Sequence, residues 1–160
     1  MQAEKRIKVI GVGNILHGDD GLGVHAINLL RQEGLPAEVI LEDGGVAGID
    51  LLYMLEDMEY AFIIDCLDAG EEPGAMFRVP WEEIADSARE DRLISMHQID
   101  LWAVLSLAER RNKMPKVIIY GIQPENMDFG QGLSPTVEKA ASSLVKKIKE
   151  EIYQVYSILK

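Results

Sequence analysis

The chain has 160 residues, of which 48% are apolar, 27% charged and 6% aromatic. This length is enough for one domain with its own hydrophobic core and short for two, so we expect a single domain over residues 1–160. The net charge of −11, from 16 basic and 27 acidic residues, repels a phosphate backbone and argues against nucleic-acid binding.

We expect neither a membrane span nor a secretory leader. No apolar run approaches the roughly 20 residues of a transmembrane helix, and polar residues from Asn14 to Asp20 interrupt any apolar signal core. The single cysteine, Cys66, excludes an internal disulfide framework and a paired-cysteine metal site. A reduced, cytoplasmic setting is therefore the expected location.

In the first half of the chain, short apolar runs alternate with amphipathic stretches, which is typical of alternating strands and helices. Gly34 and Pro36 end the first helix, because glycine accepts the left-handed cap and proline cannot continue a helix. The predicted elements are, in order, a strand at Ile7–Gly11, a helix at Leu22–Glu33, a strand at Glu38–Leu41, a helix at Gly48–Glu56, a buried strand at Tyr60–Asp65 and an edge strand at Ala75–Val79.

The second half continues this alternation and contains a helix-start signal. Ser95 and Gln98 match the S-x-x-Q capping box, which predicts a helix from Ser95 to about Arg111. His97 then lies in the first turn of that helix. The remaining predicted elements are a buried strand at Lys116–Gly121 and a long C-terminal helix that opens with Ser134 and Pro135.

Continuous apolar strands separated by helices imply a mostly parallel sheet that helices cover on both faces. In such sheets the functional groups gather beyond the carboxyl ends of the strands. The residues that follow each predicted strand are therefore the candidates for chemistry.

The residues from Gly11 to Gly23 form a glycine-rich loop between the first strand and the first helix. Such a loop suggests a dinucleotide site, since glycine lets the backbone approach a pyrophosphate at a helix N-terminus. However, Leu16 replaces the third glycine of that motif, and Asp19 and Asp20 place negative charge where a phosphate would lie. The loop is better suited to offering carboxylates to a cation. A non-catalytic nucleotide-binding module stays as an alternative, and so does a helix N-cap role for Asp20.

Asp65 and His97 are two further candidates for metal ligands. Asp65 ends a buried strand, where an ionised carboxylate is costly unless it is paired or binds a metal. The alternatives are a solvated strand end and a hydrogen-bond partner for a nearby backbone loop. For His97 the alternative is a structural histidine, with His17 and His25 as competitors for the ligand role. Asp20, Asp65 and His97 come from three elements that a parallel sheet brings to one edge. Two oxygens and one nitrogen suit a divalent ion such as nickel, zinc or manganese.

The other residues beside strand ends have weaker signals. Cys66 follows Asp65 directly and is a candidate nucleophile, but no nearby cation is evident to lower its pKa, so we interpret it as a small buried apolar side chain. The segments Asp43–Gly45 and Gly121–Glu125 both follow predicted strands, which makes them rim loops able to grip a substrate backbone. Ordinary turns are the alternative for both.

Five of these segments together resemble a known family over almost the whole chain: Gly11–Gly23, Asp43–Gly45, Ile63–Asp65, Ser95–Gln98 and Gly121–Glu125. They resemble the hydrogenase maturation proteases, the endopeptidases that finish the large subunit of nickel–iron hydrogenases. The most specific parts are the G-x-G-N-x4-D-[DE]-x-x-G segment and the His-Gln pair.

The resemblance implies a three-layer α/β/α sandwich around a twisted, mainly parallel sheet of about five strands. It also implies that the protein removes a C-terminal peptide from a hydrogenase large-subunit precursor after nickel insertion, with the substrate's nickel as the recognition signal. The family's three metal-ligand positions match Asp20, Asp65 and His97, the first of which is often Glu in the family. These three are the expected catalytic and metal-binding residues.

Two roles stay open for these three residues. They ligate a metal that activates water, or they ligate the substrate's nickel and so position the scissile bond. Nickel is expected to arrive in the substrate, and another divalent metal such as zinc could occupy the site in vitro. A spore-type endopeptidase of the same architecture is an alternative that the His-Gln pair and the short chain disfavour. The residues expected to contact the substrate are Gly13, Asn14, Asp43, Gly44, Gly45, Gln98, Pro124 and Glu125.

Overall fold

The computed structural model describes residues 7–46, 48–83, 96–112 and 114–159, and for residues 96–100 it describes the backbone alone. Within these ranges the chain forms a five-stranded sheet in the order β2-β1-β3-β5-β4. Neighbouring strands run parallel except for β4, which pairs antiparallel with β5 at one edge. The strands are β1 (Ile7–Val12), β2 (Val39–Gly45), β3 (Tyr60–Cys66), β4 (Met76–Pro80) and β5 (Lys116–Ile122).

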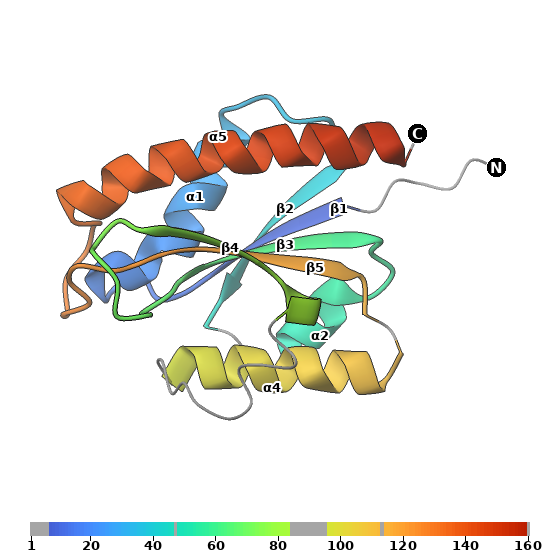
Figure 1. The fold of residues 1–160 in the computed structure, drawn as a ribbon, viewed down its shortest axis with the longest axis horizontal. Coiled ribbons are helices and arrows are strands. Elements are labelled where there is room, and N and C mark those ends of the chain that lie inside the picture. The colour runs from blue at the N-terminus through green and yellow to red at the C-terminus, as the bar shows by residue number, and fades with distance from the viewer. Residues whose placement is uncertain (1–6, 47, 84–95, 113, 160) are drawn as a thin grey trace.

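Helices cover both faces of the sheet. The helices α1 and α5 lie on one face, and α2 and α4 lie on the other (Figure 1). The predicted three-layer α/β/α sandwich is therefore confirmed. None of the described helices combines the length and the apolar content that crossing a membrane requires. The helices are α1 (Leu22–Arg31), preceded by the 3-10 turn η1 (Gly18–Gly21), α2 (Asp50–Leu55), α4 (Met96–Arg110) and α5 (Pro135–Ile158).

The central strands are buried on both faces because successive residues of a strand point to opposite sides of the sheet. In β3, Phe62 and Ile64 belong to the core with α1 and α5, whereas Ala61 and Ile63 belong to the core with α2 and α4. All four side chains are fully buried. Burial on both faces explains why this part of β3 is a continuous apolar run in the sequence rather than an alternating one.

The second strand is longer than the sequence predicts. The strand β2 continues to Gly45 instead of ending at Leu41, because its pairing with β1 continues. Gly11 pairs with Asp43, and after a bulge Val12 pairs with Gly45. Residues 43–45 are therefore the end of a strand, and their prediction as a loop was wrong.

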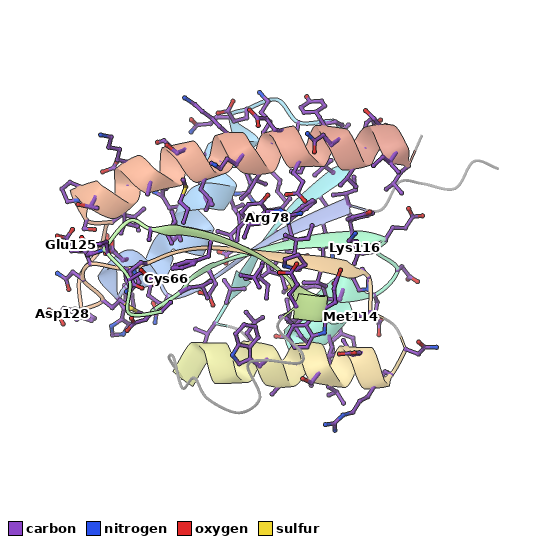
Figure 2. The ribbon with its side chains drawn as sticks, in the orientation of Figure 1. Cys66, Arg78, Met114, Lys116, Glu125 and Asp128 are labelled. Carbon is purple, nitrogen blue, oxygen red and sulfur yellow. The ribbon has the colours of Figure 1, made fainter. Side chains whose placement is uncertain are left out.

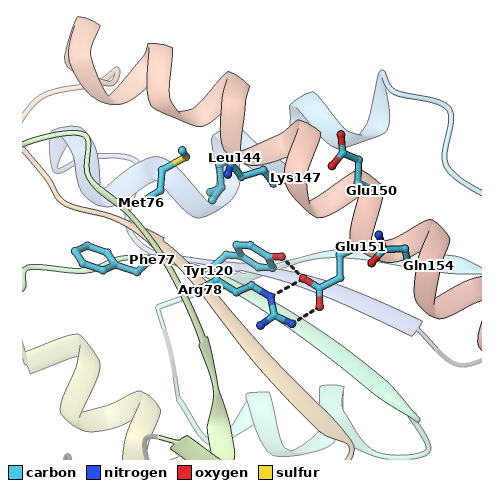
Figure 3. A pocket seen from close by; sticks show the side chains of 9 residues that line it. All are labelled: Met76, Phe77, Arg78, Tyr120, Leu144, Lys147, Glu150, Glu151 and Gln154. Carbon is cyan, nitrogen blue, oxygen red and sulfur yellow. Dashed lines mark hydrogen bonds and ion pairs between the residues drawn. The ribbon is translucent and has the colours of Figure 1, made fainter.

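The edge strand β4 is attached to α5 by a charged cluster on the sheet face that α1 and α5 cover (Figure 3). Glu151 accepts hydrogen bonds from Nε and Nη2 of Arg78, at 2.7 and 2.6 Å, and a third from the hydroxyl group of Tyr120. These side chains line a groove between β4 and α5, together with Met76 and Leu144. The cluster holds the edge strand against the longest helix.

Candidate active site

The carboxyl ends of β1, β2, β3 and β5 meet at one edge of the sheet, since these strands run parallel. Cys66, Glu125 and Asp128 lie at this end of the molecule, whereas Met114 and Lys116 lie toward the opposite end (Figure 2). The candidate site is built from the ends of β1 and β3 and from the loops around them.

Asp65 is the next-to-last residue of the central strand β3 and is completely buried. One of its carboxylate oxygens, Oδ1, accepts the backbone N–H of Cys66 at 2.8 Å. The other, Oδ2, is also buried, and no donor among the described residues bonds to it. Leaving a buried polar atom without a partner costs roughly 1–3 kcal/mol. Asp65 therefore remains a candidate ligand, and its role as one stays a prediction.

Asp20 lies in η1 and is only 2% exposed. Its predicted alternative as a helix N-cap was wrong, because the cap position of α1 is Gly21 and no side chain caps that helix. Instead, Oδ2 of Asp20 accepts the backbone N–H of Asn14 at 3.0 Å. The carboxylate is thereby held inside the loop that follows β1.

Gly13 makes this loop possible. Its φ is 135°, and a Cβ there would lie 1.9 Å from the carbonyl oxygen of Asp20, so no other residue fits without moving the backbone. The next residue, Asn14, accepts the N–H of Leu16 on its side-chain Oδ1 at 2.9 Å. Gly13 and Asn14, which we predicted as substrate contacts, therefore also shape the loop that holds Asp20.

Burial and neighbouring charges raise the pKa values of two side chains at this edge. Burial raises the pKa of Asp65 well above its usual range, and the nearby charge of Asp20 raises it further. The pKa of the Cys66 thiol is also raised, first by burial and then by the charges of Asp65 and Asp20. Cys66 is buried and stays protonated, which confirms its interpretation as a small apolar side chain and not a nucleophile.

Asp19 has a structural role that the sequence analysis missed. It is fully buried, and its carboxylate accepts four hydrogen bonds at 2.7–2.9 Å from the loop before α5. The donors are the backbone N–H groups of Glu125, Asn126 and Ser134 and the hydroxyl group of Ser134. The sequence feature that could have indicated this role is the acidic pair itself. If Asp20 is a ligand, the neighbouring carboxylate of Asp19 needs a separate explanation.

Gln123 fixes the loop after β3 from the end of β5, and sequence reasoning gave it no separate role. Its Oε1 accepts the N–H groups of Ala69 at 2.8 Å and Glu71 at 3.2 Å. Its Nε2 donates to Oδ1 of Asp68 at 3.0 Å. A buried amide therefore sets the course of the chain just beyond Asp65.

Two other predicted substrate-contact segments lie at this edge. Gly45, at the end of β2, accepts the N–H of Gly13 on its carbonyl oxygen at 2.8 Å, and Asp43 accepts the N–H of Gly45. Of the pair after β5, Pro124 is buried and Glu125 is exposed. The ends of β1, β2 and β5 therefore lie at the same edge of the sheet as Asp65, and the predicted contacts with a substrate stay a prediction.

His97 lies in the first turn of α4, as the capping box predicts. This end of α4 is on the same side of the molecule as the carboxyl ends of the strands (Figure 1). Ser95, predicted as the N-cap, and the side chains of His97 and Gln98 lie outside the described residues. The convergence of His97 with Asp20 and Asp65 therefore stays a prediction.

The two competing histidines are placed differently. His17 is exposed, and its ring packs edge-on against Phe129 with the ring centres 5.9 Å apart. His25 lies in α1 and is half-buried. Among the side chains that the structure describes, no three metal-binding groups come together, either around these histidines or around Asp20 and Asp65.

The comparisons with known proteins agree with this geometry. The family model described as "Hydrogenase maturation protease" matches residues 24–151. The Hydrogenase 2 maturation protease of Escherichia coli (strain K12) is 35% identical over 146 residues, which cover 89% of this chain and 88% of that protein. This chain belongs to the hydrogenase maturation protease family.

Two further comparisons extend the likeness to the whole maturation protease fold. The hydrogenase expression/formation protein HupD of Thiocapsa roseopersicina is 31% identical over 157 residues, or 96% of this chain and 71% of that protein. The structure of the hydrogenase maturating endopeptidase HybD from E. coli superposes with a TM-score of 0.84 at 32% identity, covering 94% of this chain and 93% of that one.

Acidic side chains lie at the edge of this maturation protease where the phosphate of a nucleotide would bind. Asp20 and Asp65 bring two buried carboxylates together at the start of α1, where a pyrophosphate would otherwise bind. Their negative charge repels phosphate and attracts a divalent ion. The geometry therefore disfavours the nucleotide-binding alternative.

Proposed function

We propose that this protease removes the C-terminal extension of a nickel–iron hydrogenase large-subunit precursor after nickel has been inserted. The observation that carries the proposal is the buried Oδ2 of Asp65, which has no donor among the described residues and lies in the field of Asp20. A carboxylate in that state is stabilised by a cation, and a nickel-loaded substrate brings one.

Asp20, Asp65 and His97 are the residues we assign to the substrate's nickel. Two carboxylate oxygens and one imidazole nitrogen are a donor set that suits nickel or zinc and leaves coordination positions for the substrate's own ligands. The nickel thereby acts as a checkpoint. A precursor without nickel brings no cation for the two carboxylates to bind, so its scissile bond is not positioned for cleavage. Holding the nickel also fixes the position of the chain that follows it, and so of the bond to be cut.

The alternative use of the same residues is to hold a divalent ion, such as zinc, that belongs to the enzyme. Such an ion would supply Lewis-acid polarisation of the scissile carbonyl and an activated water. The checkpoint and the resident ion differ in one consequence, because only the checkpoint makes cleavage depend on nickel in the substrate. We expect the reaction in the cytoplasm, in keeping with the single reduced cysteine.

A processing assay tests the proposal. The purified protease is mixed with nickel-loaded and nickel-free precursor of the large subunit encoded in the same genome, and the product is followed by gel mobility and by mass. We expect cleavage of the nickel-loaded form alone. Equal cleavage of both forms would refute the checkpoint but keep the protease, whereas no cleavage of either form would refute the assigned substrate.

A further inference from the structure

Five large apolar side chains are exposed on three loops around the candidate site. We call them the apolar rim: Ile15 (50% exposed), Leu16 (42%), Val46 (51%), Ile49 (58%) and Phe129 (80%). They follow β1, β2 and β5 in the chain, at the edge that holds Asp20 and Asp65. Several exposed apolar side chains at one edge favour an interaction surface, because the contact of apolar groups with water is unfavourable and is relieved when a partner covers them.

The loops that carry the apolar rim are fixed to one another. Gly18 donates its N–H to the carbonyl oxygen of Gly130 at 2.8 Å, and Gly130 donates to that of Leu16 at 2.8 Å. Gly13 and Gly45 join the loops after β1 and β2 in the same way. A mobile loop can turn an apolar side chain inward, but loops bonded in this way keep it exposed.

The buried carboxylate of Asp19 adds to this rigidity. It bonds the turn that follows Leu16 to the segment before α5, on both sides of Phe129. The ring of Phe129 then rests against His17 and remains 80% exposed. The apolar rim is therefore preorganised in the free protein, which lowers the conformational entropy lost on binding.

We propose that the apolar rim is the docking surface for the hydrogenase precursor, and that it takes a segment with apolar and basic side chains next to the scissile bond. The proposal rests on the proposed function, which makes this edge the place where a polypeptide must lie. The exposed carboxylates of Asp43, Glu125 and Asp128 lie beside the rim residues in the chain and favour basic partners. A second copy of the chain, which carries the same net charge of −11, is disfavoured by repulsion.

Docking on the apolar rim and recognition of nickel can be measured separately, by comparing nickel-free with nickel-loaded precursor. The nickel-free precursor should bind the rim without being cut, so its dissociation constant reports docking alone. The nickel-loaded precursor reports docking through KM and the later steps through kcat. Contacts that are equally strong before and during cleavage change KM and leave kcat unaltered.

The variants are Phe129→Ser and Ile49→Ser, on two different loops. The matched control is Ile158→Ser, because Ile158 is 75% exposed in the last turn of α5, far from the loops of the rim along the fold. All three remove an exposed side chain, and circular dichroism checks that each variant folds. We expect the rim variants to raise the Kd for nickel-free precursor and the KM for nickel-loaded precursor on the order of tenfold each, with kcat unchanged, and the control to change neither.

Four other outcomes would be decisive. Rim variants that match the control in Kd and KM overturn the docking surface and leave the proposed function intact. A wild-type protein that binds precursor through the rim but cuts neither form refutes the proposed function and keeps the surface. A wild-type protein that binds neither form overturns the docking proposal. Rim variants that change only the sedimentation of the protein, from dimer to monomer, assign the rim to a second copy and also overturn it.

Discussion

The carboxylate of Asp19 accepts hydrogen bonds from both the backbone N–H and the hydroxyl group of Ser134, which lies 115 residues further along the chain. Ser134 is the N-cap of α5, and its hydroxyl group also accepts the N–H of Val137. One buried side chain therefore joins the turn before α1 to the start of the longest helix. Its neighbour Asp20 accepts the N–H of Asn14 inside the loop after β1, and we propose it as a ligand.

Replacing Asp19 with Ala should therefore destabilise the fold, on the order of 3 kcal/mol, since four donors lose their acceptor in a buried place. Asp20→Ala should cost less, roughly 1 kcal/mol, while abolishing processing. Urea denaturation of both variants measures the difference. Equal losses of stability would show that the two aspartates share one structural role.

The three proposed ligands give a prediction about activity. Asp20→Ala, Asp65→Ala and His97→Ala should each lower processing of nickel-loaded precursor by more than about a hundredfold, because each removes a ligand. The control His17→Ala should keep most activity at saturating precursor, because His17 lies in the loop after β1 but outside the three proposed ligands. Gel mobility of the precursor measures processing, and circular dichroism checks folding. Normal processing by His97→Ala would mean that this histidine is structural.

Asp65→Asn should make the metal-free protease more stable while abolishing its activity. The amide removes a charge that burial and Asp20 disfavour, which is worth about 1–2 kcal/mol. Because the pKa of Asp65 is raised in the fold, the native state holds this proton when the unfolded chain has lost it, and wild-type stability falls as pH rises above the usual carboxyl range.

The difference in the free energy of unfolding between Asp65→Asn and the wild type should therefore increase from about pH 4 toward neutral pH and vanish in acid. Thermal unfolding with a chelator present, over a series of pH values, measures it. A variant that is less stable than the wild type at neutral pH would show that the native fold already neutralises Asp65.

Glu151 gives a pH dependence of the opposite sign, away from the site. Burial raises its pKa, but the hydrogen bonds from Arg78 and Tyr120 and the charge of Arg78 lower it more, so the net pKa lies below its ordinary value of 4.5. The native carboxylate keeps its charge where the unfolded one is protonated. Its stabilisation is therefore complete above pH 4.5 and is lost as the pH falls through the lowered native pKa.

The variant Glu151→Gln should lose roughly 1 kcal/mol of stability at pH 7, a modest value because Arg78 is half exposed, and the loss should fade in acid. Processing activity should not change. The neighbouring Glu150→Gln, which is exposed in the same groove, is the control and should have little effect. A loss in Glu151→Gln that is constant with pH would rule out the ionised cluster as its cause.

Two glycines with positive φ differ in the space available for a Cβ atom. At Gly13 a Cβ would lie 1.9 Å from the backbone of Asp20, whereas at Gly34 no atom lies within 4 Å. Gly34→Ala should cost only the conformational strain, about 1 kcal/mol. Gly13→Ala should cost more than twice that, roughly 3 kcal/mol, and abolish processing because the loop must move. Chemical denaturation and the processing assay check both, and equal effects would contradict the crowding.

The sequence predicted best those strands that are buried on both faces of the sheet. The strands β1, β3 and β5 are apolar on both faces, so they stand out as runs, and the position of Asp65 at the end of β3 follows directly. The end of β2 could not be predicted, because Asp43–Gly45 has the composition of a turn. Pairing with β1 across a bulge makes it a strand, and pairing is a property of two segments.

The same limit applies to the candidate site. Asp65 could be selected because an ionised carboxylate at the end of a buried strand is costly unless it is paired or binds a metal. Asp20 could be selected because it belongs to an acidic pair in a glycine-rich loop. The partners of Asp19 lie 106–115 residues away, and no local pattern reveals them. The role of Gly13 likewise depends on how closely Asp20 approaches it. Local chemistry therefore selects candidate residues, and the packing of distant loops determines how those residues are held.

The buried thiol of Cys66 gives the protease a natural reporter. It is the single cysteine of the chain, it follows Asp65 directly, and its raised pKa keeps it unreactive while the end of β3 stays packed. A thiol reagent can label it only during moments when that end of the strand separates from its neighbours. The labelling rate of the unmodified protein thus measures how often this end of β3 opens. Slower labelling in the presence of nickel-loaded precursor would show that the bound substrate reduces this opening.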